Sequence, residues 1–194
     1  MSKLQWNLLF LILIALTSQV SYAGIMEVGT SVSYRSSHID SNNYQTSFST
    51  TASISYYFWE MSAIELSYTN GVSKVNIKQG TDPSYTILTG FDMYGIDFVL
   101  TFASRESAFQ PYIKLGAAQM DKEIYREVEG NSKTKIGGSS GTVPSAGIGF
   151  KIKLTKTFSI KMSIDSWISD DEDISNVNSD NLDYAARAGI SWLF

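Results

Sequence analysis

The last thirteen residues of the chain alternate strictly between two kinds of side chain. Read over 182–194, the polar set includes Asp183, Arg187 and Ser191. The other set is apolar and has aromatic residues towards both ends: Tyr184, Ala186, Ala188, Ile190, Trp192 and Phe194. Side chains of a β-strand point alternately to opposite faces, so this stretch predicts a strand with one apolar face. Such a strand suits a wall that faces lipid on one side.

The same period-two pattern recurs along the rest of the chain. We expect strands at 26–35, 48–58, 64–69, 93–102, 109–118, 145–154, 158–165 and 182–194. The connections 59–61, 104–107 and 155–156 are short, whereas 36–45, 71–85, 121–141 and 169–181 are long and polar. Short turns at one end and long loops at the other are typical of outer-membrane barrels. The pattern predicts an all-β protein, an eight-stranded antiparallel up-and-down transmembrane β-barrel over 24–194.

The first 23 residues predict a cleavable signal peptide. Lys3 precedes an apolar run over 8–16, and Ser21 and Ala23 form a small-residue cleavage site before Gly24. The run is too short for an anchor, because a membrane-spanning helix needs about 20 residues. Cleavage would leave 171 of the 194 residues and, without Lys3, 14 basic residues against 19 acidic ones. This net charge of −5 gives no reason to expect nucleic acid as a partner.

The ending of the chain resembles the last strand of bacterial outer-membrane β-barrel proteins. The whole of 24–194 is similar to the small barrels of this family, which include the OmpA transmembrane domain and the OmpX and OmpW types. The resemblance implies that the barrel assembly machinery recognises the terminal strand through Tyr184, Trp192 and Phe194. It also implies a location in the bacterial cell outer membrane, in contact with outer-membrane lipid and lipopolysaccharide. A complete aromatic girdle needs no neighbouring subunit, so we expect a monomer.

The alternation also assigns side chains to the two faces of the predicted barrel. The aromatic residues expected to face lipid are Tyr34, Phe48, Tyr56, Phe58, Tyr68, Tyr94, Phe98, Phe102, Phe109, Phe150 and Phe158. The charged residues expected in the lumen are Glu27, Arg35, Glu65, Asp97, Lys114, Lys151, Lys161, Asp165 and Arg187. Eight strands enclose a space that side chains nearly fill. The lumen charges are therefore expected to neutralise one another.

Two ion pairs follow from the expected positions of the turns. A turn centred between 105 and 106 would place Asp97 directly opposite Lys114. A loop centred on 176 would place Asp165 directly opposite Arg187. We expect both pairs as cross-strand ion pairs inside the barrel.

Lys151 is expected to face Lys161, and this like-charge pair needs a carboxylate or a water nearby. Glu27 or Glu65, from across the bore, could supply the carboxylate. Two interpretations of the lumen charges remain. They form either a path for protons or ions, or a plug of paired charges that stabilises the barrel. The narrow bore favours the plug.

The sequence contains one candidate catalytic site and one candidate metal site, and neither matches a known motif. The single histidine, His38, lies near Ser36 and Asp40, a set that could form a nucleophilic site. It lacks the His-x-Ser spacing of a lipid A deacylase, and no amphipathic helix precedes the first strand as in the palmitoyl-transferring barrels. The acidic run 170–173 lacks the turn glycine of a calcium loop. We therefore expect no enzyme activity, no cofactor and no metal.

Three classes of function remain at this point. The first is a non-enzymatic barrel that acts in surface interaction, adhesion or envelope integrity, with external loops that contact an extracellular partner. The second is a small passive pore or an OmpW-like conduit for hydrophobic compounds. A conduit needs a gap between strands or an apolar mouth, which the inward row of Ser, Lys and Asp does not supply. The third, a lipid A-modifying enzyme, would depend on His38.

Overall fold

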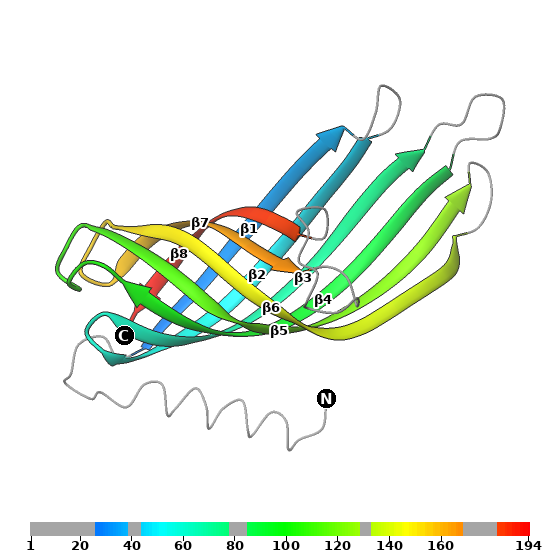
Figure 1. The fold of residues 1–194 in the computed structure, drawn as a ribbon. Coiled ribbons are helices and arrows are strands. Elements are labelled where there is room, and N and C mark those ends of the chain that lie inside the picture. The colour runs from blue at the N-terminus through cyan, green and yellow to red at the C-terminus, as the bar shows by residue number, and fades with distance from the viewer. Residues whose placement is uncertain (1–25, 39–43, 78–84, 129–132, 169–181) are drawn as a thin grey trace, which may run out of the picture.

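The structure is a computed structural model that describes residues 26–38, 44–77, 85–128, 133–168 and 182–194. Eight antiparallel strands form a closed barrel in chain order, and β1 pairs with β8 (Figure 1). The predicted strand number and topology are confirmed. The strands are β1 (Met26–His38), β2 (Tyr44–Trp59), β3 (Ser62–Ile77), β4 (Tyr85–Thr101), β5 (Phe109–Val128), β6 (Thr134–Lys153), β7 (Phe158–Ile168) and β8 (Leu182–Leu193).

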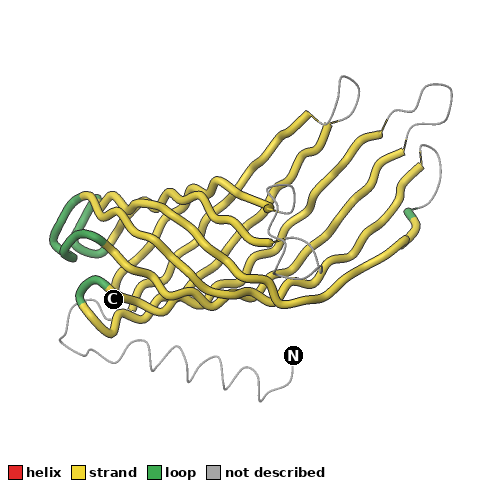
Figure 2. The backbone as a smooth tube through the Cα atoms, viewed as in Figure 1, coloured by secondary structure: helices red, strands yellow, loops and turns green. Residues whose placement is uncertain are grey.

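The described connections are short and gather at one end of the barrel. Residues 60–61, 102–108 and 154–157 form these turns, close to the carboxy terminus (Figure 2). We call this the turn end, and the opposite end the loop end. The predicted signal peptide, with its cleavage site between Ala23 and Gly24, lies outside the described residues. In the part of the chain that is described, no helix has the length and hydrophobicity to span a membrane.

The ring is closed over only part of its height. The β1–β8 ladder runs from Glu27 opposite Leu193 to Ser33 opposite Arg187. β7 has 11 residues and β8 has 12, whereas β5 and β6 have 20 each. Beyond the ends of β7 and β8, the strands β1 to β6 continue towards the loop end as an open sheet (Figure 1).

The predicted boundaries of the long loops were therefore wrong. Much of 71–85 and 121–141 is strand, because β3 continues to Ile77, β4 begins at Tyr85, β5 continues to Val128 and β6 begins at Thr134. Outside lipid neither face of a strand has to be apolar, so the alternation of polarity ends while the backbone ladder continues. The polarity pattern of these residues therefore does not show that their backbone is paired in strands.

An apolar band surrounds the closed part and has aromatic residues at both edges. It spans nine residues from Tyr94 to Phe102 and eleven from Phe48 to Phe58, and a tilted membrane strand needs about 9–11. Nine of the eleven aromatic residues predicted to face lipid are exposed on the outer surface: Tyr34, Phe48, Tyr56, Phe58, Tyr68, Tyr94, Phe98, Phe102 and Phe109. Phe150 and Phe158 are half-buried and lie against the rings of Phe109 and Trp192, with ring centroids 5.4 and 5.8 Å apart.

The outer face changes from apolar to polar just beyond Tyr68 and Tyr94, whose ring centroids are 5.0 Å apart. The Tyr68 hydroxyl donates to Asp92 Oδ1 at 2.6 Å, and Asn70 Nδ2 donates to the same oxygen at 2.9 Å. On β5 and β6 the exposed Gln119 donates to Ser140 Oγ at 2.9 Å. A hydrogen-bonded polar surface of this kind suits water, so the lipid ends at the level of the two tyrosines.

We call the open sheet beyond this level the wall. It comprises residues 35–38, 44–47, 70–77, 85–92, 119–128 and 134–143. Its outer face includes an exposed ion pair in which Lys135 Nζ lies 2.6 Å from Glu123 Oε1. This hydrogen bond holds the pKa of the Glu123 carboxyl below its ordinary value. Since β5 and β6 each have 20 residues, about ten more than a membrane strand needs, the wall extends about 30 Å along the strands.

Large inward side chains lie opposite glycines in the closed part. A Cβ atom on Gly147 would lie 2.3 Å from Asp165 Oδ1 and 2.8 Å from Lys114 Cε. A Cβ atom on Gly149 would lie 2.6 Å from the Tyr112 hydroxyl. Real Cβ atoms do not approach other atoms this closely, so the long inward side chains depend on glycine across the ladder.

We predict that Gly147→Leu lowers the free energy of unfolding by about 1–3 kcal/mol, because overpacking displaces the buried Asp165 and Lys114. Gly90→Leu is the control, since a Cβ atom at Gly90 meets nothing within 4 Å. Both changes remove the same glycine flexibility from the unfolded chain. Urea titration of tryptophan fluorescence in refolded barrels measures the difference. Equal midpoints for the two variants would contradict this account of the bore.

Candidate functional site

Eight charged side chains fill the middle of the bore, and we call them the lumen network. Four carry negative charge and four positive charge, so the network is neutral. Seven are buried and the eighth, Lys161, is half-buried. The members are Glu27, Glu65, Asp97, Lys114, Lys151, Lys161, Asp165 and Arg187.

The half of the network nearer the turn end is built around two lysines. Lys151 lies directly opposite Lys161 across the β6–β7 ladder, as predicted. Lys151 Nζ contacts Glu27 Oε2 at 2.8 Å, and the Tyr57 hydroxyl donates to the same oxygen at 2.7 Å. Lys161 Nζ lies 2.9 Å from Glu65 Oε2 and 3.7 Å from Glu27 Oε1. Both carboxylates therefore offset the repulsion between the two lysines.

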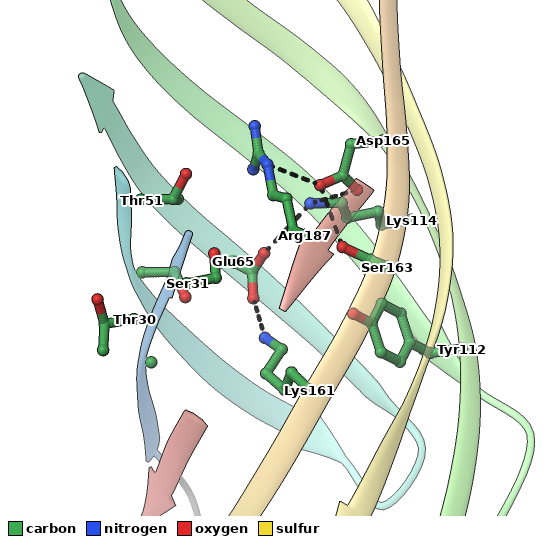
Figure 3. A pocket seen from close by; sticks show the side chains of 12 residues that line it. Thr30, Ser31, Thr51, Glu65, Tyr112, Lys114, Lys161, Ser163, Asp165 and Arg187 are labelled. Carbon is green, nitrogen blue, oxygen red and sulfur yellow. Dashed lines mark hydrogen bonds and ion pairs between the residues drawn. The ribbon is translucent and has the colours of Figure 1, made fainter. Parts of the chain in front are cut away.

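The other half is built around Lys114 and Asp165. Lys114 Nζ lies 3.0 Å from Asp165 Oδ1, 3.6 Å from Glu65 Oε1 and 3.9 Å from Asp97 Oδ2. Arg187 Nε lies 3.2 Å from Asp165 Oδ2. Figure 3 shows Glu65 and Asp165 directed towards these cations from the strands that surround the bore. Because Glu65 contacts both Lys161 and Lys114, the two halves form one continuous network.

The predicted register of the first ion pair was wrong by two residues. Lys114 lies opposite Val99, and Asp97 lies opposite Gly116. A Cβ atom on Gly116 would lie 2.4 Å from Asp97 Oδ1, so the carboxylate occupies the space that a side chain at 116 would need. Asp97 and Lys114 are still within 3.9 Å because the two side chains meet diagonally.

The second predicted register was wrong by the same amount. Arg187 lies opposite Ser163, and Asp165 lies opposite Ala185 on β8 and Gly147 on β6. Across these two ladders the large inward side chains therefore meet diagonally, although Lys151 and Lys161 lie directly opposite each other elsewhere in the bore. Asp97, Asp165 and Arg187 each face a small residue across these ladders, and each aspartate pairs with the charge two residues away from the directly opposite position.

Arg35, the ninth predicted lumen charge, lies outside the network. It stands towards the loop end, where β1 no longer pairs with β8, and its guanidinium carbon lies 4.5 Å from the centre of the Tyr184 ring. Tyr184 is exposed on the outer face of β8, as are Trp192 and Phe194 near the turn end. Their recognition by the assembly machinery stays a prediction.

The turn end of the bore is closed by two side chains that the sequence did not single out. Arg105 donates to the carbonyl oxygens of Trp59 at 3.0 Å and Glu60 at 3.2 Å. Gln110 Nε2 lies within 3.2 Å of three carbonyl oxygens of the 102–108 turn. The Arg105 guanidinium also lies 5.0 Å from the centre of the Tyr57 ring. Carbonyl groups of neighbouring turns meet only in the folded barrel, so no sequence signal marks this closure.

Little space remains inside the closed part. A cavity of about 30 Å³ lies within the lumen network, between Glu65, Lys161 and Arg187 (Figure 3). That is room for about two water molecules. A second cavity, of about 20 Å³, lies at the turn end beside Arg105 and Lys151.

The candidate catalytic residues around His38 and the candidate metal-binding run 170–173 fall largely outside the part of the chain that the structure describes. The side chain of His38 and the whole of Asp40 and 170–173 lie outside the described residues. In the described ranges, no three His, Cys, Asp or Glu side chains are grouped so as to hold a metal ion.

A closed ring of eight antiparallel strands, with an apolar outer band and a polar charged interior, defines a small transmembrane β-barrel. Residues 8–194 match the outer membrane protein beta-barrel domain, so the chain belongs to that family of bacterial outer-membrane proteins. The predicted family and location are confirmed. In such barrels short turns face the periplasm, which places the wall outside the cell.

Solved structures of similar fold have low sequence identity to the chain. The amino-terminal barrel domain of Pseudomonas aeruginosa OprF is 16% identical with a TM-score of 0.57, and the match covers 89% of this chain and 99% of that barrel-domain chain. Neisserial surface protein A is 14% identical with a TM-score of 0.55 and the same coverage. Ail of Yersinia pestis, bound to the heparin analogue sucrose octasulfate, is 13% identical with a TM-score of 0.51, covering 87% and 99%. No curated protein matches the chain by sequence.

We predict that Glu65→Gln lowers the free energy of unfolding by about 3–5 kcal/mol, because it leaves buried cations without a matching charge. Lys161→Met in the same chain is expected to recover part of the loss, since it removes one unmatched cation. Glu123→Gln, which breaks an exposed ion pair, should leave the unfolding midpoint unchanged within error. Urea titration of the refolded barrels measures all three. A Glu65→Gln barrel as stable as the wild type would refute the role of the network.

Proposed function

We propose that the protein is a closed, non-conducting outer-membrane barrel that acts in surface interaction or adhesion through its wall and external loops. The lumen network is the observation that carries the closed, non-conducting part of this proposal. Its eight side chains pair across the bore with no net charge, and the cavity among them has room for only about two water molecules. A passing ion would have to displace several buried ion pairs at once.

The wall supports a role at the cell surface. Its longest strands, β5 and β6, continue for about 30 Å along the strand direction beyond the lipid. Its outer face carries polar groups in hydrogen bonds such as Ser140 to Asp121 and Thr142 to Gln119. Ail, a barrel of the same fold, was crystallised with a sulfated sugar ligand. Binding of an extracellular ligand is therefore compatible with this fold.

Two other functions have less support. Small barrels of this family are generally not enzymes, and we propose that this chain is not one. A role in envelope integrity would require only the membrane-embedded barrel and not the wall.

We further propose that the protein is exported through the signal peptide 1–23, with cleavage between Ala23 and Gly24. We also propose that the assembly machinery recognises Tyr184, Trp192 and Phe194.

The refolded barrel is expected to show no steady conductance in a planar bilayer, because the neutral network closes the bore. Asp97→Ala and Lys114→Ala are the companion variants, since each removes one member of the network. Discrete openings in the wild type that either substitution alters would overturn the closed barrel and make the protein a pore.

Shortening the wall is expected to abolish surface contact without unfolding the barrel. Residues 121–140 would be replaced by Asn-Gly, a two-residue hairpin turn, because Met120 lies directly opposite Gly141. Cells that display the full or the shortened chain are compared for adhesion to cultured epithelial cells and to immobilised heparin. Shift of gel mobility on heating confirms folding. Equal adhesion by both chains would refute the role assigned to this part of the wall, and changed detergent sensitivity would favour envelope integrity.

A further inference from the structure

The apolar band is hollowed on one side by a groove with a volume of about 510 Å³. Strands β5 to β8 form most of this groove, together with Phe102 just beyond the end of β4. It lies on the lipid-facing surface, because side chains that line it, such as Ile148 and Ile164, are exposed on the outside of the barrel. Ligand pockets in proteins have volumes of about 300–1,000 Å³. We call this feature the outer groove.

Two neighbouring rows of outward residues form the sides of the outer groove. In each row the residues lie directly opposite one another across the strand ladders. One row consists of Ile113, Ile148, Ile164 and Ala186. The other consists of Pro111, Phe150 and Met162. All of these residues line the groove and all are apolar, so its sides are hydrocarbon.

The floor of the outer groove is the backbone of the row between these two. This middle row consists of Tyr112, Gly149, Ser163 and Arg187, again directly opposite one another. Tyr112, Ser163 and Arg187 also line the small cavity within the lumen network, because strand alternation turns their side chains into the bore. They therefore reach the outer groove through their main chain. None of its described lining residues directs a polar side chain outward.

The outer groove runs across the strands, from the turn end towards the outer edge of the membrane. On β5 it begins at Pro111, two residues from Phe109 at the start of the strand. On β8 it ends at Ala186, two residues from Tyr184 at the outer edge of the apolar band. Four strands spaced about 4.8 Å apart give it a length of about 15 Å. One leaflet of the hydrocarbon core is also about 15 Å deep.

We propose that the outer groove binds one phospholipid molecule of the periplasmic leaflet by an acyl chain. The occupant is a lipid because the groove lies within the band that the bilayer surrounds, where no water reaches a polar ligand. It belongs to the periplasmic leaflet because the groove begins beside the turns, at the level of the head groups of that leaflet. The length of the groove matches the depth of the leaflet, so a whole chain can lie in it.

The strength of this binding depends on packing. Inside a bilayer the hydrophobic effect does not distinguish the groove from the surrounding lipid, because both are apolar. A chain in the groove instead has van der Waals contacts with fixed walls on two sides and with the floor. This lipid site goes beyond the surface role proposed above and does not depend on it.

Native mass spectrometry of the full protein, extracted from outer membranes in mild detergent, tests the proposal. One phospholipid per barrel is expected to remain bound. After removal of lipid, the probes are two phosphatidylethanolamines with the same head group, one with two palmitoyl chains and one with two hexanoyl chains. The palmitoyl probe is expected to bind saturably, one per barrel. The hexanoyl probe is expected to bind about tenfold more weakly, because shorter chains lose on the order of ten atom contacts.

Matched variants locate the lipid. Ala186→Phe places a ring in the groove and is expected to weaken binding of the palmitoyl probe about tenfold. Ala52→Phe makes the same change at an exposed position of β2 outside the groove and should leave binding unchanged. If Ala186→Phe fails to fold, as judged by its gel mobility on heating, Ile164→Ala decides, because it removes part of one side of the groove. Ile54→Ala on β2 is its control.

Several results would overturn the proposal. Retention of lipid A in place of a phospholipid would show that the occupant comes from the other leaflet. A dimer without lipid would show that a second copy of the chain covers the groove. A barrel that retains no lipid, or equal binding by the folded groove variants and their controls, would show that the groove is not a lipid site.

Discussion

Charge neutrality in a crowded bore is the constraint on which the closed barrel depends. Removing charged groups from water is costly unless each is paired, and eight strands leave space for side chains but not for bulk water. Four acids and four bases meet this condition together, and no single member could be removed without leaving the rest with a net charge. Glycines across the ladder provide the space in which the long side chains meet, as Gly116 does for Asp97 and Gly147 does for Lys114. Packing and electrostatics are therefore coupled in this interior.

The two ends of the barrel differ because only one of them is closed. At the turn end Arg105 and Gln110 satisfy backbone carbonyl groups and close the bore. Towards the loop end β7 and β8 stop early, and the remaining strands continue as the wall (Figure 1). The features that could meet an extracellular ligand or another surface are therefore on the outer side of the membrane. The closed network below them separates this side from the periplasm.

Sequence reasoning succeeded where lipid imposes a pattern and failed where it does not. Between the aromatic edges, alternation assigned residues such as Tyr94 and Asp97 to opposite faces, and the structure places them there. Beyond Tyr68 the same strands were taken for loops, because residues exposed to water on both faces carry no alternation. The apolar group around Met120 and Trp167 was missed for a related reason, since the inward row was read as uniformly polar. A conduit was disfavoured partly for lack of an apolar mouth, and the structure does place one group of apolar side chains inside the barrel on the loop side of the lumen network.

The sequence by itself determined that the chain forms eight strands, which face of each strand meets lipid, and which charges enter the lumen. Period-two alternation is a local property of the sequence. It can be recognised because the face of each strand that meets the bilayer has to be apolar. The tertiary structure decided which charges pair, because a register depends on the length of each turn and on the small residues across the ladder. Asp97 and Asp165 accordingly meet their partners two residues away from the predicted positions. The early end of the β1–β8 ladder, and with it the contact of Arg35 with Tyr184, likewise depends on strand pairing between the two ends of the chain.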